Sequence, residues 1–190
     1  MEIIIKKLSA ERTEDFFRFF DYDAFSDHDE WAGCYCLESH LSEQENSQLW
    51  GQKKKRRVKA EELIQAGIMT GYLIYDASRV VGWCNIGDKS DYRSICENEK
   101  YRTDNLEKGK IKIIYCMDIA PSYRGRGIAN LIVEKALADA KEEGFSYMEA
   151  YPFTDKELTY QYKGPRRLYE KHGFVLYREL TDFYIMRRTL

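Results

Sequence analysis

The sequence contains no run of apolar residues long enough to cross a membrane, and its first residues, Met1 to Lys6, lack the layout of a signal peptide. Its 30 basic and 32 acidic residues leave a net charge of −2, without the basic excess typical of proteins that bind nucleic acid or anionic membranes. Internal repeats and low-complexity linkers are also absent. We therefore expect no nucleic-acid partner and no membrane partner.

The five cysteines show no framework of paired spacings. An odd number of unpatterned cysteines is typical of proteins in the reducing cytoplasm, where we expect this protein to lie. Cys34 and Cys36, with His40 close behind, look faintly like half of a metal site. Because a structural zinc normally takes four ligands and no second pair follows, we expect no bound metal.

The chain has enough apolar and aromatic sequence for one packed domain: of its 190 residues, 44% are hydrophobic and 14% aromatic. Hydrophobic periodicity and turn residues predict the order β-α-α-β-β-β-α-β-α-β-β, an α/β (α+β) fold in which helices flank a mixed sheet. A long charged helix is predicted over about 42–66, and residues 87–110 are predicted to form a loop. The final hairpin, 174–188, offers a sheet edge for a homodimer.

A glycine-rich turn joins the apolar strand predicted at 111–119 to the helix that follows. Its sequence is Arg124-Gly125-Arg126-Gly127-Ile128-Ala129. Such a turn leaves backbone N–H groups unpaired at the start of a helix, where the helix dipole also favours an anion. Glycine allows close approach of the ligand, and the arginines add charged donors. The turn therefore predicts a phosphate-binding site.

Two common phosphate-binding motifs do not fit this turn. A P-loop requires Lys followed by Ser or Thr after its last glycine, and here Ile128-Ala129 follows. The dinucleotide fingerprint requires three glycines in an early strand–helix unit. The spacing that is present is Arg-x-x-Gly-x-Ala, preceded by Ile119-Ala120-Pro121.

In these residues the chain resembles the GNAT superfamily of N-acetyltransferases, whose (Gln/Arg)-x-x-Gly-x-(Gly/Ala) turn binds the pyrophosphate of acetyl-CoA. Val80-Val81-Gly82-Trp83 is similar to the third strand of that family, and Leu168-Tyr169-Glu170-Lys171-His172-Gly173-Phe174 is similar to its C-terminal signature. The resemblance covers residues 70–190 well and the rest only by element order. It implies a mostly antiparallel central sheet in a single acetyltransferase domain. Residues 1–70 would form its acceptor side and residues 71–190 its acetyl-CoA-binding core.

The resemblance also implies a cofactor site and a reaction. The residues that bind acetyl-CoA would be Met117, Asp118, Ile119, Ala120, Arg124, Gly125, Arg126, Gly127, Ile128, Ala129 and Tyr169. A backbone N–H between Met117 and Ile119 would polarise the thioester carbonyl, and Tyr169 would protonate the departing thiolate. An amine, from a small molecule or a protein, would attack directly in a ternary complex. A non-catalytic module that binds or senses acyl-CoA is the alternative.

The general base is open between two carboxylates, Glu149 and Asp118. Each lies in an otherwise apolar strand, where a carboxylate is unexpected unless it is functional, ion-paired or on a wet face. The residues do not decide between these explanations.

One segment departs from the family's pattern. Many members carry an asparagine after the fifth strand that contacts CoA, whereas here Pro152-Phe153-Thr154-Asp155 begins an insertion that runs through Lys163. Tyr160, Tyr162 and Lys163 of this insertion are expected to shape the acceptor pocket. Cys34 and Cys36 are expected to line it as well.

Overall fold

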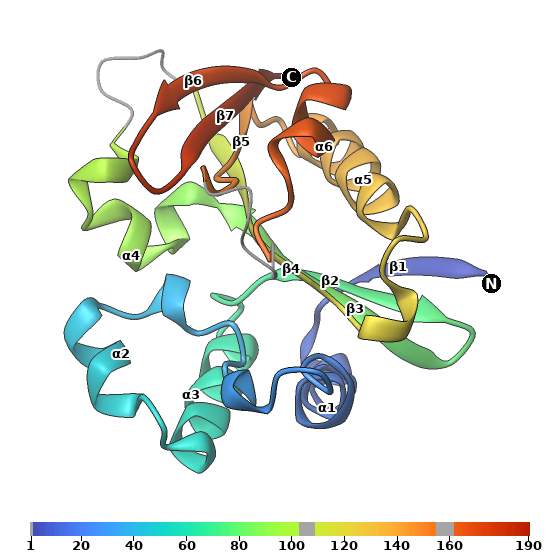
Figure 1. Cartoon of the computed structure of the whole chain (residues 1–190). Helices are drawn as coiled ribbons and strands as arrows, with labels where there is room; N and C mark the ends of the chain where they lie inside the picture. The colour runs from blue at the N-terminus through green and yellow to red at the C-terminus, as the bar shows by residue number, and fades with distance from the viewer. Residues whose placement is uncertain (1, 103–108, 155–161) are drawn as a thin grey trace.

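The computed structural model describes residues 2–102, 109–154 and 162–190. One seven-stranded sheet, ordered β1-β2-β3-β4-β5-β7-β6, lies at its centre (Figure 1). The strands are β1 (Ile3–Lys7), β2 (Gly71–Asp76), β3 (Arg79–Asp88), β4 (Ile111–Ile119), β5 (Tyr147–Ala150), β6 (Val175–Glu179) and β7 (Tyr184–Thr189). Neighbouring strands are antiparallel except β4 and β5, which are parallel. The predicted mixed, mostly antiparallel sheet flanked by helices is confirmed.

Helices cover both faces of the sheet (Figure 1). They are α1 (Thr13–Arg18), α2 (Glu43–Leu49), α3 (Lys53–Gln65), α4 (Arg93–Cys96), α5 (Ile128–Glu142) and α6 (Arg166–Lys171). On the side of α1 and α3, a core rich in aromatic rings forms around Trp83, which Phe16 contacts edge-on at 4.9 Å between ring centroids. On the opposite side, the apolar face of α5 packs over the sheet through Ile128, Ile132 and Ala136. None of the helices in the described ranges is long and apolar enough to cross a membrane.

The helix predicted over about 42–66 is in fact two helices. Ser42 begins α2 with a reciprocal capping box to Glu45, and the helix ends before Trp50 and Gly51. Gly51 has a φ of 75°, a left-handed conformation that glycine adopts without steric cost and that commonly ends a helix. The prediction of one continuous helix was wrong because it passed over this glycine.

The region predicted as a loop, residues 87–110, contributes to the core in its described part. It contains α4, and the side chains of Tyr92 and Ile95 are buried. Pro165 directly precedes α6.

A β-bulge in β4 shapes the middle of the sheet. Asn85 pairs with Cys116 while the next residue, Ile86, pairs with Ile114, so Tyr115 is an extra residue on β4. The parallel pairing of β4 with β5 stops at Ile114. The second half of β4 therefore has no β5 partner on that side.

A buried polar network ties the segment before α2 to β3. The Asn85 amide, fully buried, donates to the carbonyl oxygen of Cys36 at 3.4 Å and lies 3.3 Å from Nε2 of His40. The Tyr92 hydroxyl donates to the Asn85 side-chain oxygen at 2.6 Å. Burial lowers the pKa of His40 from 6.5 to about 4, because the charged ring would lose its hydration.

We expect this network to make stability depend on pH. His40 takes up a proton near pH 6.5 in the unfolded state and only near pH 4 in the folded state. The contribution of the neutral ring to the free energy of unfolding is therefore fully present above pH 6.5 and is lost as the pH falls towards 4. The shift corresponds to roughly 3 kcal/mol. Urea unfolding should show that the free energy of unfolding falls more between pH 7.5 and pH 4.5 in the native protein than in His40→Gln. Equal losses in both proteins would contradict this role.

Candidate active site

The predicted anion-binding turn lies between β4 and α5. Gly125 has a φ of 73°, and Gly127, the residue that caps α5, has a φ of 83°. Across residues 125–129, which the structure describes in full, no backbone N–H has a backbone acceptor. These five consecutive donors lie at the positive end of a 15-residue helix, the arrangement that the predicted phosphate site requires.

The two arginines of the turn contact neighbouring groups of the protein. Arg124 donates from Nε to the carbonyl oxygen of Ile119 at 2.9 Å, and its guanidinium pairs with Asp27. This hydrogen-bonded pairing lowers the pKa of Asp27. The Arg126 guanidinium lies 5.2 Å from the ring centroid of Tyr123. Arg124 therefore braces the turn.

The remaining predicted cofactor residues connect this turn to the sheet. The Ala120 N–H donates to the carbonyl oxygen of Val81 at 3.0 Å, which anchors the end of β4 to β3. Ile128 is buried in the core beneath α5, and Ala129 packs against that core. The strand, turn and helix are thus joined through the sheet and the core beneath α5.

Two predicted catalytic donors meet at the free side of β4. The Met117 N–H donates to the carbonyl oxygen of Tyr162 at 2.6 Å, and the Tyr169 hydroxyl donates to the carbonyl oxygen of Lys163 at 2.6 Å. Tyr169 is fully buried, and burial raises its pKa well above the ordinary value. The carbonyl oxygens of two successive residues, Tyr162 and Lys163, therefore accept the hydrogen bonds of these two donors. No pattern in the sequence signals this arrangement.

Gly164 allows the chain to pass this close. It has a φ of 72°, and a Cβ atom there would lie 2.8 Å from the Met117 methyl group and 3.0 Å from the Tyr169 oxygen. A residue with a side chain would have to displace one of them.

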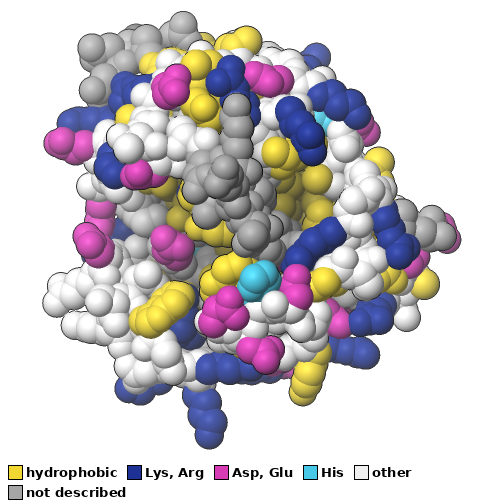
Figure 2. Space-filling model, viewed as in Figure 1, with side chains coloured by type: hydrophobic (Ala, Val, Ile, Leu, Met, Phe, Trp, Pro, Cys, Tyr) yellow, Lys and Arg dark blue, Asp and Glu magenta, His cyan; other side chains and the backbone are white. Residues whose placement is uncertain are grey.

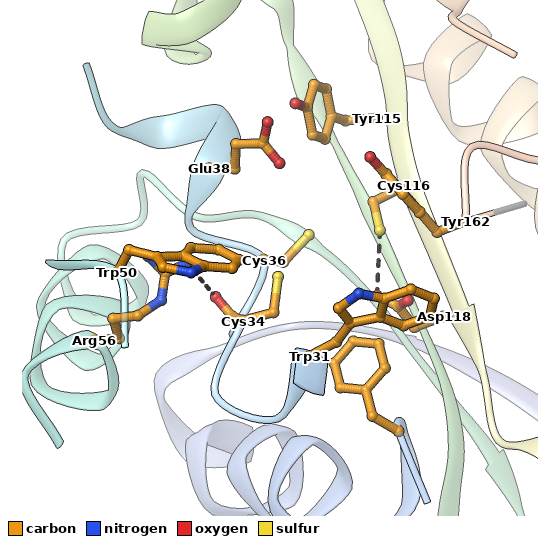
Figure 3. Close-up of a pocket in the computed structure, with 11 residues that line it drawn as sticks. Trp31, Cys34, Cys36, Glu38, Trp50, Arg56, Tyr115, Cys116, Asp118 and Tyr162 are labelled. Carbon is orange, nitrogen blue, oxygen red and sulfur yellow. Dashed lines mark hydrogen bonds between the residues drawn. The ribbon is translucent and has the colours of Figure 1, made fainter. Parts of the chain in front are cut away.

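On the face of the sheet that α1 and α3 cover, a cavity of about 160 Å³ lies against β4 (Figure 3). Aromatic rings, thiols, two carboxylates and one guanidinium line it. These residues are Phe25, Trp31, Trp50, Tyr115, Tyr162, Cys34, Cys36, Cys116, Glu38, Asp118 and Arg56. In Figure 2, hydrophobic side chains are visible near the middle of the molecular face seen in Figure 1, with acidic side chains around them.

An unusual backbone conformation brings Cys34 and Cys36 to this cavity. Tyr35 and Cys36 have φ values of 45° and 51°, in the left-handed region that costs a non-glycine residue about 1 kcal/mol or more. The buried Arg56 guanidinium holds the segment by donating to the carbonyl oxygens of Gly33 and Cys34 at 2.9 and 2.8 Å. Hydrogen bonds from a charged donor offset this strain.

The two candidate bases lie in different surroundings. Glu149 is fully buried in a closed cluster, where it accepts hydrogen bonds from Arg187, from Lys89 at 2.8 Å and from the Tyr151 hydroxyl at 2.8 Å. Asp118, 2% exposed, lines the cavity and accepts from the Cys116 thiol at 3.2 Å. The geometry favours a structural role for Glu149, whereas Asp118 lies in the wall of the cavity.

Other sequence predictions fall at or near the cavity. Tyr162 lines it, whereas the Lys163 ammonium is buried 4.4 Å from the ring centroid of Tyr115. Tyr160 lies outside the described residues. His40 does not join Cys34 and Cys36. The described residues instead place Cys36, Cys116 and Asp118 with their ligand atoms within 4.8 Å of one another, three potential ligands where a structural zinc takes four.

The fold is that of known acetyltransferases. PaiA N-acetyltransferase from Thermoplasma acidophilum, solved in complex with coenzyme A, matches over 100% of both chains with 15% identity and a TM-score of 0.59. A GNAT-family acetyltransferase from Listeria monocytogenes matches 100% of this chain and 96% of its own, with 12% identity and a TM-score of 0.61. One from Streptococcus pneumoniae matches with 14% identity, coverage of 100% and 99%, and a TM-score of 0.56.

The family follows from the sequence itself. Residues 69–176 match the family described as "Acetyltransferase (GNAT) domain", and the chain belongs to this family. No curated protein matches the chain. The matched range includes β4, the anion-binding turn and α6, so it contains all the predicted cofactor residues.

The turn provides a matched pair of glycines for a binding test. Gly127 and Gly144 lie at the two ends of α5, both with positive φ, and at each a Cβ atom would meet no other atom within 4 Å. Changing either to Ala therefore adds similar backbone strain, but only Gly127→Ala places a methyl group at the proposed phosphate site. Calorimetry should show coenzyme A binding at least about tenfold more weakly to Gly127→Ala, about 1.4 kcal/mol, and little changed in Gly144→Ala. Equal affinities for the two variants would contradict the placement of the site.

Proposed function

We propose that this protein is an N-acetyltransferase that transfers the acetyl group of acetyl-CoA to an amine by direct attack in a ternary complex. The observation that carries the proposal is the alignment of three features along β4. The anion-binding turn follows the strand, the Met117 N–H lies on its unpaired side, and the cavity lies against its face. The coenzyme A named with the PaiA structure supports the choice of donor.

The pyrophosphate of acetyl-CoA would accept hydrogen bonds from the N–H groups of residues 125–129. Hydrogen bonds to a charged group contribute roughly 1.5–3 kcal/mol each. Several of them, with the dipole of α5, offset the cost of fixing a flexible ligand. Arg124 acts indirectly in this proposal, because it holds the turn through Ile119 and Asp27.

The thioester carbonyl would replace the Tyr162 carbonyl as the acceptor of the hydrogen bond from the Met117 N–H. A donor fixed in a strand stabilises the negative charge that develops on this oxygen when the amine attacks. The Tyr169 hydroxyl would leave the Lys163 carbonyl and turn to the departing sulfur. Burial raises the pKa of Tyr169, so the phenol is protonated when the thiolate forms. Transfer of its proton then depends on the hydroxyl being held against the sulfur, because the thiolate is the weaker base.

Asp118 would receive the proton that the attacking amine loses. It is the buried carboxylate at the cavity wall, one residue from Met117. Glu149 has no such place in the proposal, because Arg187, Lys89 and Tyr151 engage it.

The protein's surroundings are also proposed. All five cysteines are free thiols, as expected in the reducing cytoplasm. The edge strand β6 exposes Val175 and Leu176, which would suit pairing with a second copy. We propose that the protein acts in the cytoplasm, forms a homodimer and requires no metal.

Release of CoA thiol separates an enzyme from a module that only senses acyl-CoA. An enzyme should release thiol from acetyl-CoA when a suitable amine is added, whereas a sensor would bind CoA and release none. Tyr169→Phe should lower kcat by roughly 100-fold, since the leaving thiolate loses its proton donor.

Tyr72→Phe is the matched control. Tyr72 is also a buried tyrosine, but its hydroxyl donates to Asp139 at 2.7 Å beneath α5. It should retain a kcat close to that of the native protein. A Tyr169→Phe enzyme with full kcat would remove this residue as the acid.

A further inference from the structure

We propose that the cavity beside β4 selects a small primary amine attached to a flat aromatic body, with no carboxylate next to the amine. This inference rests on the proposed acetyl transfer and names the acceptor class for the same site. It comes from the shape, the walls and the charge of the cavity.

Flat apolar groups dominate the walls (Figure 3). Trp31 packs edge-on against Phe25 with ring centroids 6.1 Å apart, and both rings line the cavity. Trp50, at the end of α2, is 61% exposed although it also lines the cavity. An exposed indole at a cavity wall offers apolar area that an aromatic ligand would cover.

The size of the cavity limits the ligand. A cavity of about 150 Å³ with apolar walls holds a molecule the size of benzene, and this one measures about 160 Å³. One ring with a short alkyl arm fits that space. A polyamine would leave the aromatic walls uncovered.

The charge of the cavity determines what the ring may carry. Asp118 is the buried carboxylate among the lining residues, and it suits an ammonium group before the proton is lost. The positive charge of Arg56 is directed at the carbonyls of Gly33 and Cys34 and at the Asn46 side chain. An α-carboxylate on the ligand would therefore lie close to Asp118. Among the described residues, Arg56 is the cation in the lining, and the buried Lys163 ammonium lies behind it against the Tyr115 ring, 4.4 Å from the ring centroid.

A panel of amines in the thiol-release assay tests this inference. We expect kcat/KM for 2-phenylethylamine to exceed that for phenylalanine, which adds only a carboxylate, by at least about 100-fold, and that for spermidine by at least about tenfold. Trp31→Ala and, separately, Trp50→Ala should each raise KM for 2-phenylethylamine several-fold while leaving coenzyme A affinity unchanged. Tyr22→Ala, which removes an aromatic ring that is 75% exposed outside the cavity, should change neither value.

The outcomes separate this inference from the proposed function. Coenzyme A binding without thiol release for any amine would overturn the acetyltransferase itself. Turnover of spermidine or phenylalanine in preference to 2-phenylethylamine, or a native KM in both tryptophan variants, would overturn the aromatic acceptor and leave the transferase standing. Loss of 2-phenylethylamine turnover on treatment with a chelator would assign Cys36, Cys116 and Asp118 to a metal and overturn the pairing of Asp118 with an ammonium.

Discussion

The end of pairing between β4 and β5 is the constraint on which the rest of the site depends. The two strands are parallel neighbours only as far as Ile114, and the bulge at Tyr115 turns the following residues of β4. An unpaired strand inside a protein must find other partners for its backbone groups. Here the Met117 N–H finds the Tyr162 carbonyl, an acceptor that a thioester carbonyl could replace with little change in hydrogen bonding.

Different interactions support the site on the two faces of the sheet. On the side of α5, the anion-binding turn is held by backbone hydrogen bonds and by the pairing of Arg124 with Asp27, which links it to the N-terminal part of the chain. On the side of α1 and α3, Arg56 holds the strained segment that carries Cys34 and Cys36 to the cavity. Strain at this segment agrees with a functional role, because positions of high backbone energy persist where a site requires them.

Local chemistry explains what the sequence could predict. The Arg124–Ala129 turn follows from glycine, a strand and a helix that are contiguous in the chain. The prediction for Tyr169 came from a short motif, Leu168–Phe174, that begins in α6 and ends beyond it. The ion cluster around Glu149 could not be predicted, because Lys89 and Arg187 lie 60 and 38 residues away. The same holds for the contact of Cys36 with Cys116 and for the carbonyls that occupy Met117 and Tyr169. The end of α2 before Gly51 could have been predicted, because a glycine within a predicted helix is a sequence signal for a helix end.

A crystal structure of the protein with coenzyme A would test the central claim most directly. The account predicts the pyrophosphate on the N–H groups of residues 125–129 and the pantetheine arm along the unpaired side of β4. The Tyr162 carbonyl would then no longer accept from the Met117 N–H. Coenzyme A bound elsewhere, or bound at the turn with the Tyr162–Met117 hydrogen bond still in place, would contradict the account.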